Sequence, residues 1–372
     1  MEEQLTIFDM LPEDEAERFK PIKPTDWKWT FADYPKEKND LKVFSCFACG
    51  GGSTMGYKLA GCDVIGCCEI DSKINDVYVK NHNPKYNYVM DIRKFNALPD
   101  NELPEELFNL DILDGSPPCT TFSMVGDRED SWGKKKKFRE GQAEQTLDDL
   151  SFVFIDSVKK LKPKVMIMEN VEGLLLGEAW GYVQKIYAQL HEIGYSVKHW
   201  LCKGEIMGVP QTRHRVIFVA VSKDIGFNLE SVDMSFNYAP VLYGEIKSGE
   251  ERISNGKINS VIKQMKKGEK FCDTMKRIYG KSSGFSRVVI DRDDIFPTQT
   301  AGHADVWLTN GNRPSFIDVI RAQTFPEDYD FMGKQIEYIC GMSVPPVMMK
   351  RVVTRLIDSG VFGYKGINKC TS

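Results

Sequence analysis

Short apolar runs alternate with helical stretches from Leu41 to about Val221, and this alternation constrains the fold more than any other feature of the sequence. Apolar strings such as 63–69 (DVIGCCE) and 165–168 (VMIM) are typical of strands that are buried on both faces. The stretches between them have the length and spacing of helices. The alternation therefore predicts an α/β fold whose mostly parallel sheet is covered by helices on both faces.

The individual elements can be assigned from the same patterns. A one-sided apolar stripe predicts a helix that ends near Leu161, and Gly360 stops a final amphipathic helix near Asp358. The expected strands are 41–47, 63–69, 110–114, 165–168, 195–202 and 215–221, and the other expected helices are 51–60, 72–81 and 182–193.

Charge and composition divide the rest of the chain. Residues 1–40 hold eleven acids against six bases and four prolines without periodicity, so we expect a flexible acidic arm. After Ser222 the alternation stops, and residues 247–287 carry a net charge of +7 in a chain whose net charge is −4. The expected parts are the arm at 1–40, a catalytic domain at 41–222, an inserted domain at 223–312 and a returning segment at 313–372.

Several classes of protein are excluded by composition. No stretch of about 18 apolar residues is present, and the acidic start MEEQLTIFDM does not resemble a signal peptide, so we expect a cytoplasmic protein without a membrane contact. Ten cysteines without a disulfide pattern fit a reducing compartment. The five histidines and the single CxxC at 46–49 lack zinc-site spacing, so no metal is expected.

Unusual residues gather where the expected strands end, which is where open α/β sheets bind ligands. Three glycines at 50–52 follow the first strand and Glu69 ends the second, a spacing that suits a nucleotide-like ligand and its ribose. Asp91 follows another apolar string and is either an adenine contact or a solvated acid. Pro117 and Pro118 hold Cys119 at the rim, where a thiol can act as a nucleophile. Glu169 ends the VMIM strand, where an acid beside a heterocycle could share a proton with a ring nitrogen.

These residues resemble, in order, the motifs of the DNA cytosine-5 methyltransferases. The similarity covers about Leu41 to Gly360. The strings that carry it are Phe47-Ala-Cys-Gly-Gly-Gly52, Glu69, Asp91-Ile92, Ser116-Pro-Pro-Cys-Thr-Thr-Phe-Ser123, Glu169-Asn-Val171, Gln211-Thr-Arg-His-Arg215 and Gly341-Met-Ser-Val-Pro-Pro346. The resemblance implies a Rossmann-like sheet that binds S-adenosylmethionine, with a small target-recognition domain inserted at 223–312.

The resemblance also implies an activity: methyl transfer to C5 of a flipped-out cytosine in a specific site of double-stranded DNA. Cys119 would add to C6, Glu169 would hold N3 and the exocyclic amine, and Arg215, together with Arg213, would bind O2. For Arg213, a phosphate contact and a structural role stay open. The implied cofactor residues are Phe47, Gly50, Gly52, Glu69, Ile70, Asp91, Ile92, Pro118, Ser343 and Val344.

Basic residues suggest where DNA binds. The loop after Cys119 contains four consecutive lysines between glycines, and such a loop could close on phosphates as a lid. A second cluster lies in the stretch of net charge +7. The expected DNA-binding residues are Ser123, Lys134, Lys135, Lys136, Lys137, Arg139, Gln211, Lys263, Lys266 and Lys267.

Two positions depart from the family pattern. Cys49 stands where the motif has its first glycine, and Met342 stands where the last motif has asparagine. Both changes bear on the strength of cofactor binding rather than on the nucleophile.

Three alternatives are weighed against this interpretation. An amino-methyltransferase would place an aromatic residue after the proline pair, where this chain has Cys119. A DNA-binding regulator without activity would not need Cys119 or Glu169. A tRNA cytosine-5 methyltransferase of the same family is the closest rival. The sequence leaves open the DNA site, the oligomeric state, for which a monomer is expected, and whether a restriction nuclease accompanies the enzyme.

The arm contains one further motif. Gln4-Leu5-Thr6-Ile7-Phe8 looks like the short peptides that dock on the bacterial sliding clamp, with a glutamine at the pocket mouth and apolar anchors behind it. Chance similarity and packing of these side chains on the protein's own surface are the competing explanations.

Overall fold

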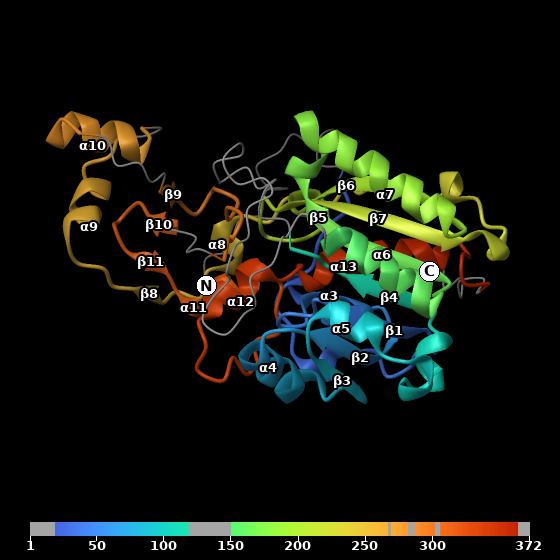
Figure 1. The fold of residues 1–372 in the computed structure, drawn as a ribbon. Coiled ribbons are helices and arrows are strands. Elements are labelled where there is room, and N and C mark those ends of the chain that lie inside the picture. The colour runs from blue at the N-terminus through green and yellow to red at the C-terminus, as the bar shows by residue number, and fades with distance from the viewer. Residues whose placement is uncertain (1–18, 119–149, 267–268, 282–286, 302–305, 364–372) are drawn as a thin grey trace. The chain divides into compact units, whose positions relative to one another are not determined.

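The computed structural model describes residues 19–118, 150–266, 269–281, 287–301 and 306–363 (Figure 1). Contacts within the chain divide them into two compact units. The sheet unit takes in 34–202, 214–235 and the chain from 348 onward, and it holds a large β-sheet. The second unit takes in 203–213, 236–347 and the described residues before 34.

The large sheet has seven strands in the order β3-β2-β1-β4-β5-β7-β6. The first five of these pair in parallel, whereas β7 runs antiparallel to β5. The strands are β1 Lys42–Cys46, β2 Asp63–Glu69, β3 Tyr86–Val89, β4 Ile112–Gly115, β5 Val165–Val171, β6 Tyr195–Lys203 and β7 His214–Ser222. The predicted α/β fold with a mostly parallel sheet is confirmed.

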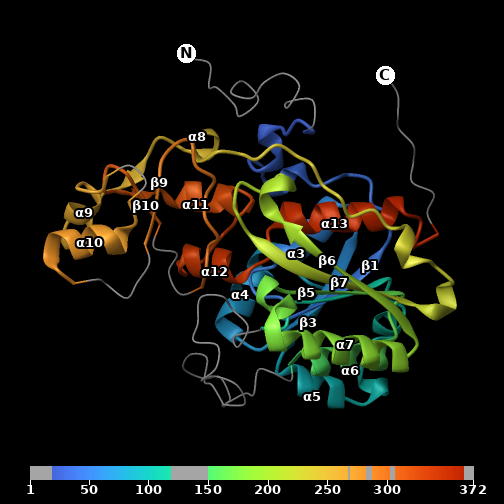
Figure 2. The ribbon, with the colours of Figure 1, turned by 90° about the horizontal axis from the view of Figure 1, so that it is seen from above.

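Helices cover both faces of this sheet: α3 and α13 lie on one face and α5, α6 and α7 on the other (Figure 2). The helices of this part are α3 Gly52–Leu59, α4 Ser72–His82, α5 Ile92–Ala97, α6 Leu150–Leu161, α7 Trp180–Glu192 and α13 Pro346–Asp358. The predicted stripe of α6 packs against the sheet, since Phe154, Val158 and Leu161 are fully buried. Within the described residues, no helix combines the length and the apolar character needed to cross a membrane.

The sequence patterns missed β3 and α5. β3 has four residues at the edge of the sheet, and none of its side chains is fully buried. A short edge strand carries little of the apolar signal from which strands are predicted.

The second unit contains shorter elements. Its strands pair as two small sheets, β8 with β11 antiparallel and β9 with β10 parallel. Val261, Ile262, Phe271 and Trp307 form a small apolar core. The elements are α8 Tyr243–Ile246, β8 Glu251–Arg252, α9 Lys257–Ile262, α10 Phe271–Tyr279, β9 Val288–Ile290, β10 Val306–Leu308, β11 Arg313–Pro314, α11 Phe316–Ala322 and α12 Ile336–Met342.

The described end of the expected arm is packed rather than free. Trp27 and Trp29 are 3% and 4% exposed. The indole N–H of Trp29 donates to the carbonyl of Thr324 at 2.9 Å, and the N–H of Phe31 donates to the Asp328 carboxylate at 3.0 Å. The expectation of a flexible arm is therefore wrong for this part, because two large aromatic side chains are removed from water there.

Candidate active site

A glycine-rich turn follows β1 and leads into α3. Its backbone is left-handed at Phe47, Cys49 and Gly51, where φ is 54°, 46° and 79°. Residue 51 has to be glycine, because a Cβ there would lie 2.1 Å from Nε2 of His82. The turn leads through Gly50 and Gly52, which are both buried, to the start of the helix, and a glycine turn at this place in an α/β sheet suits a nucleotide-like ligand.

Glu69 ends β2 and holds this turn from one side. Its Oε2 accepts a hydrogen bond from the N–H of Cys49 at 2.8 Å, and its Oε1 accepts from the N–H groups of Ile70 and Asp71. Burial raises the pKa of Glu69, and the backbone hydrogen bonds oppose that shift. The structure gives Glu69 a part in shaping the turn, and its contact with a ribose stays a prediction.

Asp91 follows β3 and caps α5. Its Oδ1 accepts a hydrogen bond from the N–H of Arg93 at 2.8 Å, and the adjacent Ile92 is buried. β3, β2 and β1 are parallel neighbours, so their carboxyl ends lie on the same side of the sheet. Asp91, Glu69 and Phe47 lie at or just after these three ends. The predicted cofactor residues at the ends of these strands are thereby brought together.

The predicted nucleophile lies just beyond the described chain. β4 ends at Gly115, beside the end of β1, and Pro118 is the last described residue before the gap. Cys119, Ser123, Lys134, Lys135, Lys136, Lys137 and Arg139 lie outside the described residues, and their roles stay predictions.

Glu169 and Arg215 form an ion pair across β5 and β7. The Nε of Arg215 lies 2.6 Å from Oε1 of Glu169, and both side chains are nearly buried, at 13% and 12% exposure. The antiparallel register places Arg215 opposite Val171, two residues beyond Glu169. Arg215 also donates from Nη1 to the carbonyl of His214 at 2.6 Å, so its guanidinium is fixed twice. The pair offers a carboxylate and a planar cation side by side, a combination that can bind the polar edge of a heterocycle.

Arg213 is not placed for chemistry. It is 2% exposed, and its guanidinium donates to the carbonyls of Gln299 and Gly341 at 2.7 and 3.0 Å. The catalytic role predicted for Arg213 is therefore wrong in this structure, and the structural alternative accounts for its position.

Gln211 belongs to the same buried network. It has no exposed surface, its Nε2 donates to Oε1 of Gln323 at 2.9 Å, and its Oε1 accepts from the N–H of Gln299. A buried amide with both ends bonded does not face DNA, so the predicted DNA contact of Gln211 is wrong. The predicted catalytic domain, 41–222, includes residues 203–213. In the structure these residues group instead with the second unit, to which this network joins them.

Ser343 and Val344 belong to the second unit and are 3% exposed each. The carbonyl of Ser343 accepts a hydrogen bond from Nε2 of Gln323 at 2.7 Å. Met342, by contrast, is 39% exposed. The cofactor contacts predicted for Ser343 and Val344 stay predictions.

The sequence patterns missed one buried acid, Asp114 of β4. Its Oδ2 accepts from the Ser45 hydroxyl at 2.7 Å and its Oδ1 accepts from the Tyr57 hydroxyl at 3.0 Å. Burial raises the pKa of Asp114 to about 7, and the hydroxyl donors oppose that shift. The signal available in the sequence is an acid inside the short buried strand 112–115 (ILDG).

Replacing Asp114 by Asn is expected to flatten part of the dependence of stability on pH. The native acid keeps its proton up to about pH 7, whereas the unfolded acid loses it near pH 4, so the free energy of unfolding of the wild type falls as pH rises through that window. The Asn variant lacks this loss and should gain about 3 kcal/mol relative to the wild type between pH 5 and pH 8. Urea unfolding of both proteins at pH 5 and pH 8 measures the free energies of unfolding. If the difference between variant and wild type is the same at both pH values, the raised pKa of Asp114 is contradicted.

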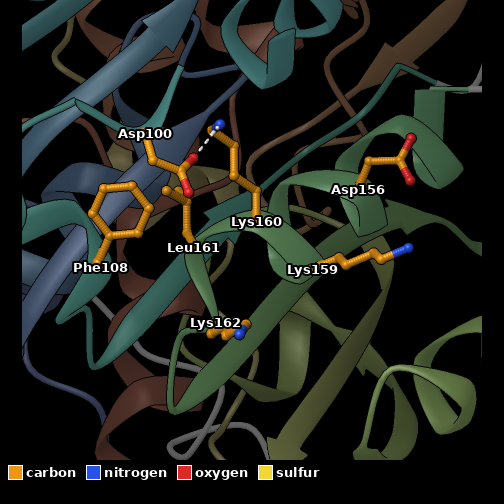
Figure 3. A pocket seen from close by; sticks show the side chains of 7 residues that line it. All are labelled: Asp100, Phe108, Asp156, Lys159, Lys160, Leu161 and Lys162. Atoms are coloured by element: carbon orange, nitrogen blue, oxygen red, sulfur yellow. Dashed lines mark hydrogen bonds and ion pairs between the residues drawn. The ribbon is translucent and has the colours of Figure 1, made fainter. Parts of the chain in front are cut away.

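One cavity of about 470 Å³ lies elsewhere in the sheet unit (Figure 3). Three lysines at the end of α6 line it, and Lys160 pairs with Asp100 at 2.8 Å. The end of α6 leads into the first residue of β5, so this cavity lies at the amino end of that strand, whereas Glu169 lies toward its carboxyl end. We therefore do not assign it to the active site. Among the described residues, no cluster of metal-ligating side chains is present.

The sheet, the turn after β1 and the acids near the strand ends define a Rossmann-like methyltransferase. The fold is shared with the crystal structure of the Dnmt2 methyltransferase of S. pombe, which has a TM-score of 0.55 and 15% identity over 86% of this chain and 99% of that one.

The chain belongs to the family of C-5 cytosine-specific DNA methylases, whose model matches residues 41–358. It is 28% identical to the Type II methyltransferase M.NgoFVII of Neisseria gonorrhoeae, over 83% of this chain and 84% of that one. It is also 25% identical to M1.HphI of Haemophilus parahaemolyticus, over 85% and 87% of the two chains. The enzyme is thus a DNA cytosine-5 methyltransferase, as the sequence motifs predicted.

Proposed function

We propose that the enzyme transfers a methyl group from S-adenosylmethionine to C5 of a cytosine that is flipped out of a specific duplex DNA site. The observation that carries the proposal is the nearly buried Glu169–Arg215 pair at 2.6 Å. A carboxyl group can hold N3 and the exocyclic amine of cytosine, and the guanidinium beside it can hold O2. Inside a stacked duplex these edges are paired, so the base has to leave the stack.

The reaction needs a nucleophile because C5 of cytosine is unreactive by itself. The Cys119 thiolate forms a bond to C6 while N3 takes up a proton from solvent through the carboxyl group of Glu169, and Arg215 holds O2. C5 of the resulting enamine is nucleophilic and would form a bond to the methyl carbon while the bond between that carbon and the sulfonium sulfur breaks, which would leave S-adenosylhomocysteine. A base then removes the C5 proton, the C6–S bond breaks, and the cysteine is restored.

The residues after β1 and β2 fit the cofactor. The turn at 47–52 has a left-handed backbone at Phe47, Cys49 and Gly51, and Glu69 lies beside it with both oxygens already oriented by N–H groups. S-adenosylmethionine, when bound, supplies an electrophilic methyl group. Phe47, Asp91 and Ile92 would hold its nucleoside, while Pro118, Ser343 and Val344 would close the site.

DNA would be bound by two basic segments. The loop with Lys134–Lys137 and Arg139 would close over phosphates next to Cys119, with Ser123 near the flipped base. Lys263 and Lys266 are exposed, and Lys267 lies outside the described residues. Lysines of this kind increase affinity for any sequence without selecting one.

Removing the three lysines 263, 266 and 267 is expected to weaken DNA binding and its dependence on salt. Each lost phosphate contact reduces the slope of log affinity against log salt by up to about one unit. Fluorescence anisotropy between 50 and 300 mM salt measures the slope. The exposed lysine 36, replaced in the same way, serves as the control, and an unchanged slope in the triple variant would show that the cluster is only a solvated surface.

Expression in a strain without DNA methylation tests the activity itself. Sequencing its DNA for 5-methylcytosine at base resolution should show one recurrent site, and the Cys119→Ala variant should leave the DNA unmodified. A competition assay with both substrates tests the alternative. Methylation of tRNA in place of DNA would show that the substrate is RNA and would overturn the proposed DNA substrate.

A monomer acting in the cytoplasm accords with these roles. Light scattering of the purified protein with and without DNA checks the mass, and a stable dimer would overturn that part of the proposal.

We propose that Gln4–Phe8 tethers the enzyme to the bacterial sliding clamp, where newly replicated DNA lacks methyl groups. These residues lie outside the described chain, and the support is the peptide's sequence: a glutamine followed by apolar anchors Leu5, Ile7 and Phe8. A synthetic peptide of residues 1–12 should bind a bacterial clamp saturably in fluorescence anisotropy. Absence of saturable binding at tens of micromolar, or binding indifferent to Gln4→Ala and Phe8→Ala, would end the idea.

A further inference from the structure

The glycine-rich turn is held on its second side by the end of α4. His82, the last residue of that helix, is buried, and its Nε2 lies 3.2 Å from the carbonyl oxygen of Gly50. A carbonyl oxygen can only accept, so Nε2 carries the hydrogen and donates it. Burial lowers the pKa of His82 to about 3, which keeps the imidazole neutral at physiological pH.

The ring of His82 also fills the space beside Gly51. A Cβ at residue 51 would lie 2.1 Å from Nε2 and 2.5 Å from Cδ2 of the ring, so backbone and imidazole are in direct contact. The histidine therefore fixes both the direction of one carbonyl and the path of the next residue.

Two further contacts fix His82, and a third fixes the tyrosine beside it. The ammonium group of Lys58 donates to the backbone carbonyl of His82 at 3.1 Å. The ring of Tyr78 lies edge-on to the imidazole, with centroids 4.6 Å apart, and the Tyr78 hydroxyl is bonded to Thr54 of α3 at 2.9 Å. His82 is thus held through its backbone carbonyl by α3 and through its ring by Tyr78 of α4.

The turn needs such support because its backbone is strained. Cys49 has φ of 46°, a left-handed conformation that residues other than glycine adopt at a cost. Glu69 restrains the N–H of Cys49, and His82 restrains the carbonyl of the following residue. Without one of the two restraints, Cys49 would be freer to return to an ordinary conformation.

We propose that His82 is a positioning residue for the cofactor: its Nε2–H and its ring hold the turn at 47–52 in the conformation that binds S-adenosylmethionine. The inference rests on the proposed cofactor role of this turn. Loss of the hydrogen bond should weaken cofactor binding, because free energy is then spent on reordering the turn. Chemistry at the cytosine should change little, since Glu169 and Arg215 lie on β5 and β7, whereas His82 ends α4 and contacts the turn after β1.

Two variants of similar size separate the hydrogen bond from the packing. His82→Leu fills the space without an N–H, and His82→Gln places an amide N–H near the position of Nε2. We expect His82→Leu to raise the dissociation constant and the KM for S-adenosylmethionine by about tenfold, with kcat at saturating cofactor within about twofold of the wild type. His82→Gln should recover most of the affinity.

A second substitution tests the strain. Adding Cys49→Gly to His82→Leu should restore part of the affinity, because glycine adopts the left-handed backbone without restraint. Tyr195→Phe is the matched control: it removes a buried hydrogen bond to the Pro163 carbonyl, away from the turn, and should leave the KM unchanged.

Isothermal titration calorimetry and steady-state kinetics on the full chain give both constants. Wild-type protein that does not bind S-adenosylmethionine would refute the proposed function. Wild-type protein that binds it, with His82→Leu binding equally well, would refute only the role of His82. The role of His82 would also be refuted if His82→Gln and His82→Leu weaken cofactor binding equally, or if kcat falls by as large a factor as the affinity for the cofactor.

Discussion

Cys119→Ala is expected to abolish methyl transfer, with kcat reduced by roughly 10⁴-fold or more, because the variant lacks the thiol proposed to make the bond to C6. Binding of duplex DNA and of S-adenosylmethionine should persist, since phosphate and backbone contacts provide most of that affinity. Transfer of tritiated methyl groups to DNA measures the rate, and gel shift measures the binding. Substantial activity in the variant would mean that another nucleophile operates.

A mechanism-based substrate tests the same bond directly. In a duplex with 5-fluorocytosine at the target position, the fluorine cannot leave as a proton does, so the wild-type enzyme should remain bound to the DNA through C6. The adduct should survive a denaturing gel and be absent with Cys119→Ala. The alternative outcome, no adduct with active wild-type enzyme, would exclude a covalent route.

The sequence predicted the order of strands and helices well because each strand carries a strong apolar run. Val165–Met168 and the stripe of α6 are dominated by side chains that the structure buries completely. β3 escaped notice because an edge strand of four residues has no such run. The tryptophans at 27 and 29 were missed for another reason: the acidic, proline-rich composition around them predicts disorder, yet burial of two indoles outweighs it.

The motifs predict the chemistry of the site, whereas the contacts that support it could not be predicted from them. The motifs identified Glu69, Glu169 and Arg215, and the structure places all three near strand ends. The motifs also assigned chemistry to Gln211 and Arg213, whose side chains are instead buried in a polar network. A motif specifies residue types but not the partners that distant segments bring, such as Gln299 and Gln323.

Asp114 and His82 are residues that the motifs do not identify although the structure gives each a role. Neither belongs to a string that the motifs single out for a role, and each acquires one from contacts between separate elements. Cys49 looked like a departure from the glycine pattern, and the structure shows what it entails: a left-handed residue other than glycine, held by Glu69.

The second large effect is expected at Glu169. Glu169→Gln keeps the shape of the side chain but cannot supply the proton at N3, so the rate of methyl transfer should fall by about 10²–10⁴-fold. Arg215→Ala should have an effect of the same order, because it removes the cation proposed to hold O2 and leaves Glu169 without its partner at 2.6 Å.

The combined variant distinguishes a working pair from two independent contacts. Since the two side chains touch each other and act on one base, Glu169→Gln with Arg215→Ala should cost little more than the worse of the single changes. Single-turnover rates at saturating DNA and cofactor are measured for the wild type, the two single variants and the double variant, which together form a double-mutant cycle. Strictly additive losses would show that the two groups act separately, and the ion pair would then be a feature of the fold rather than of the reaction.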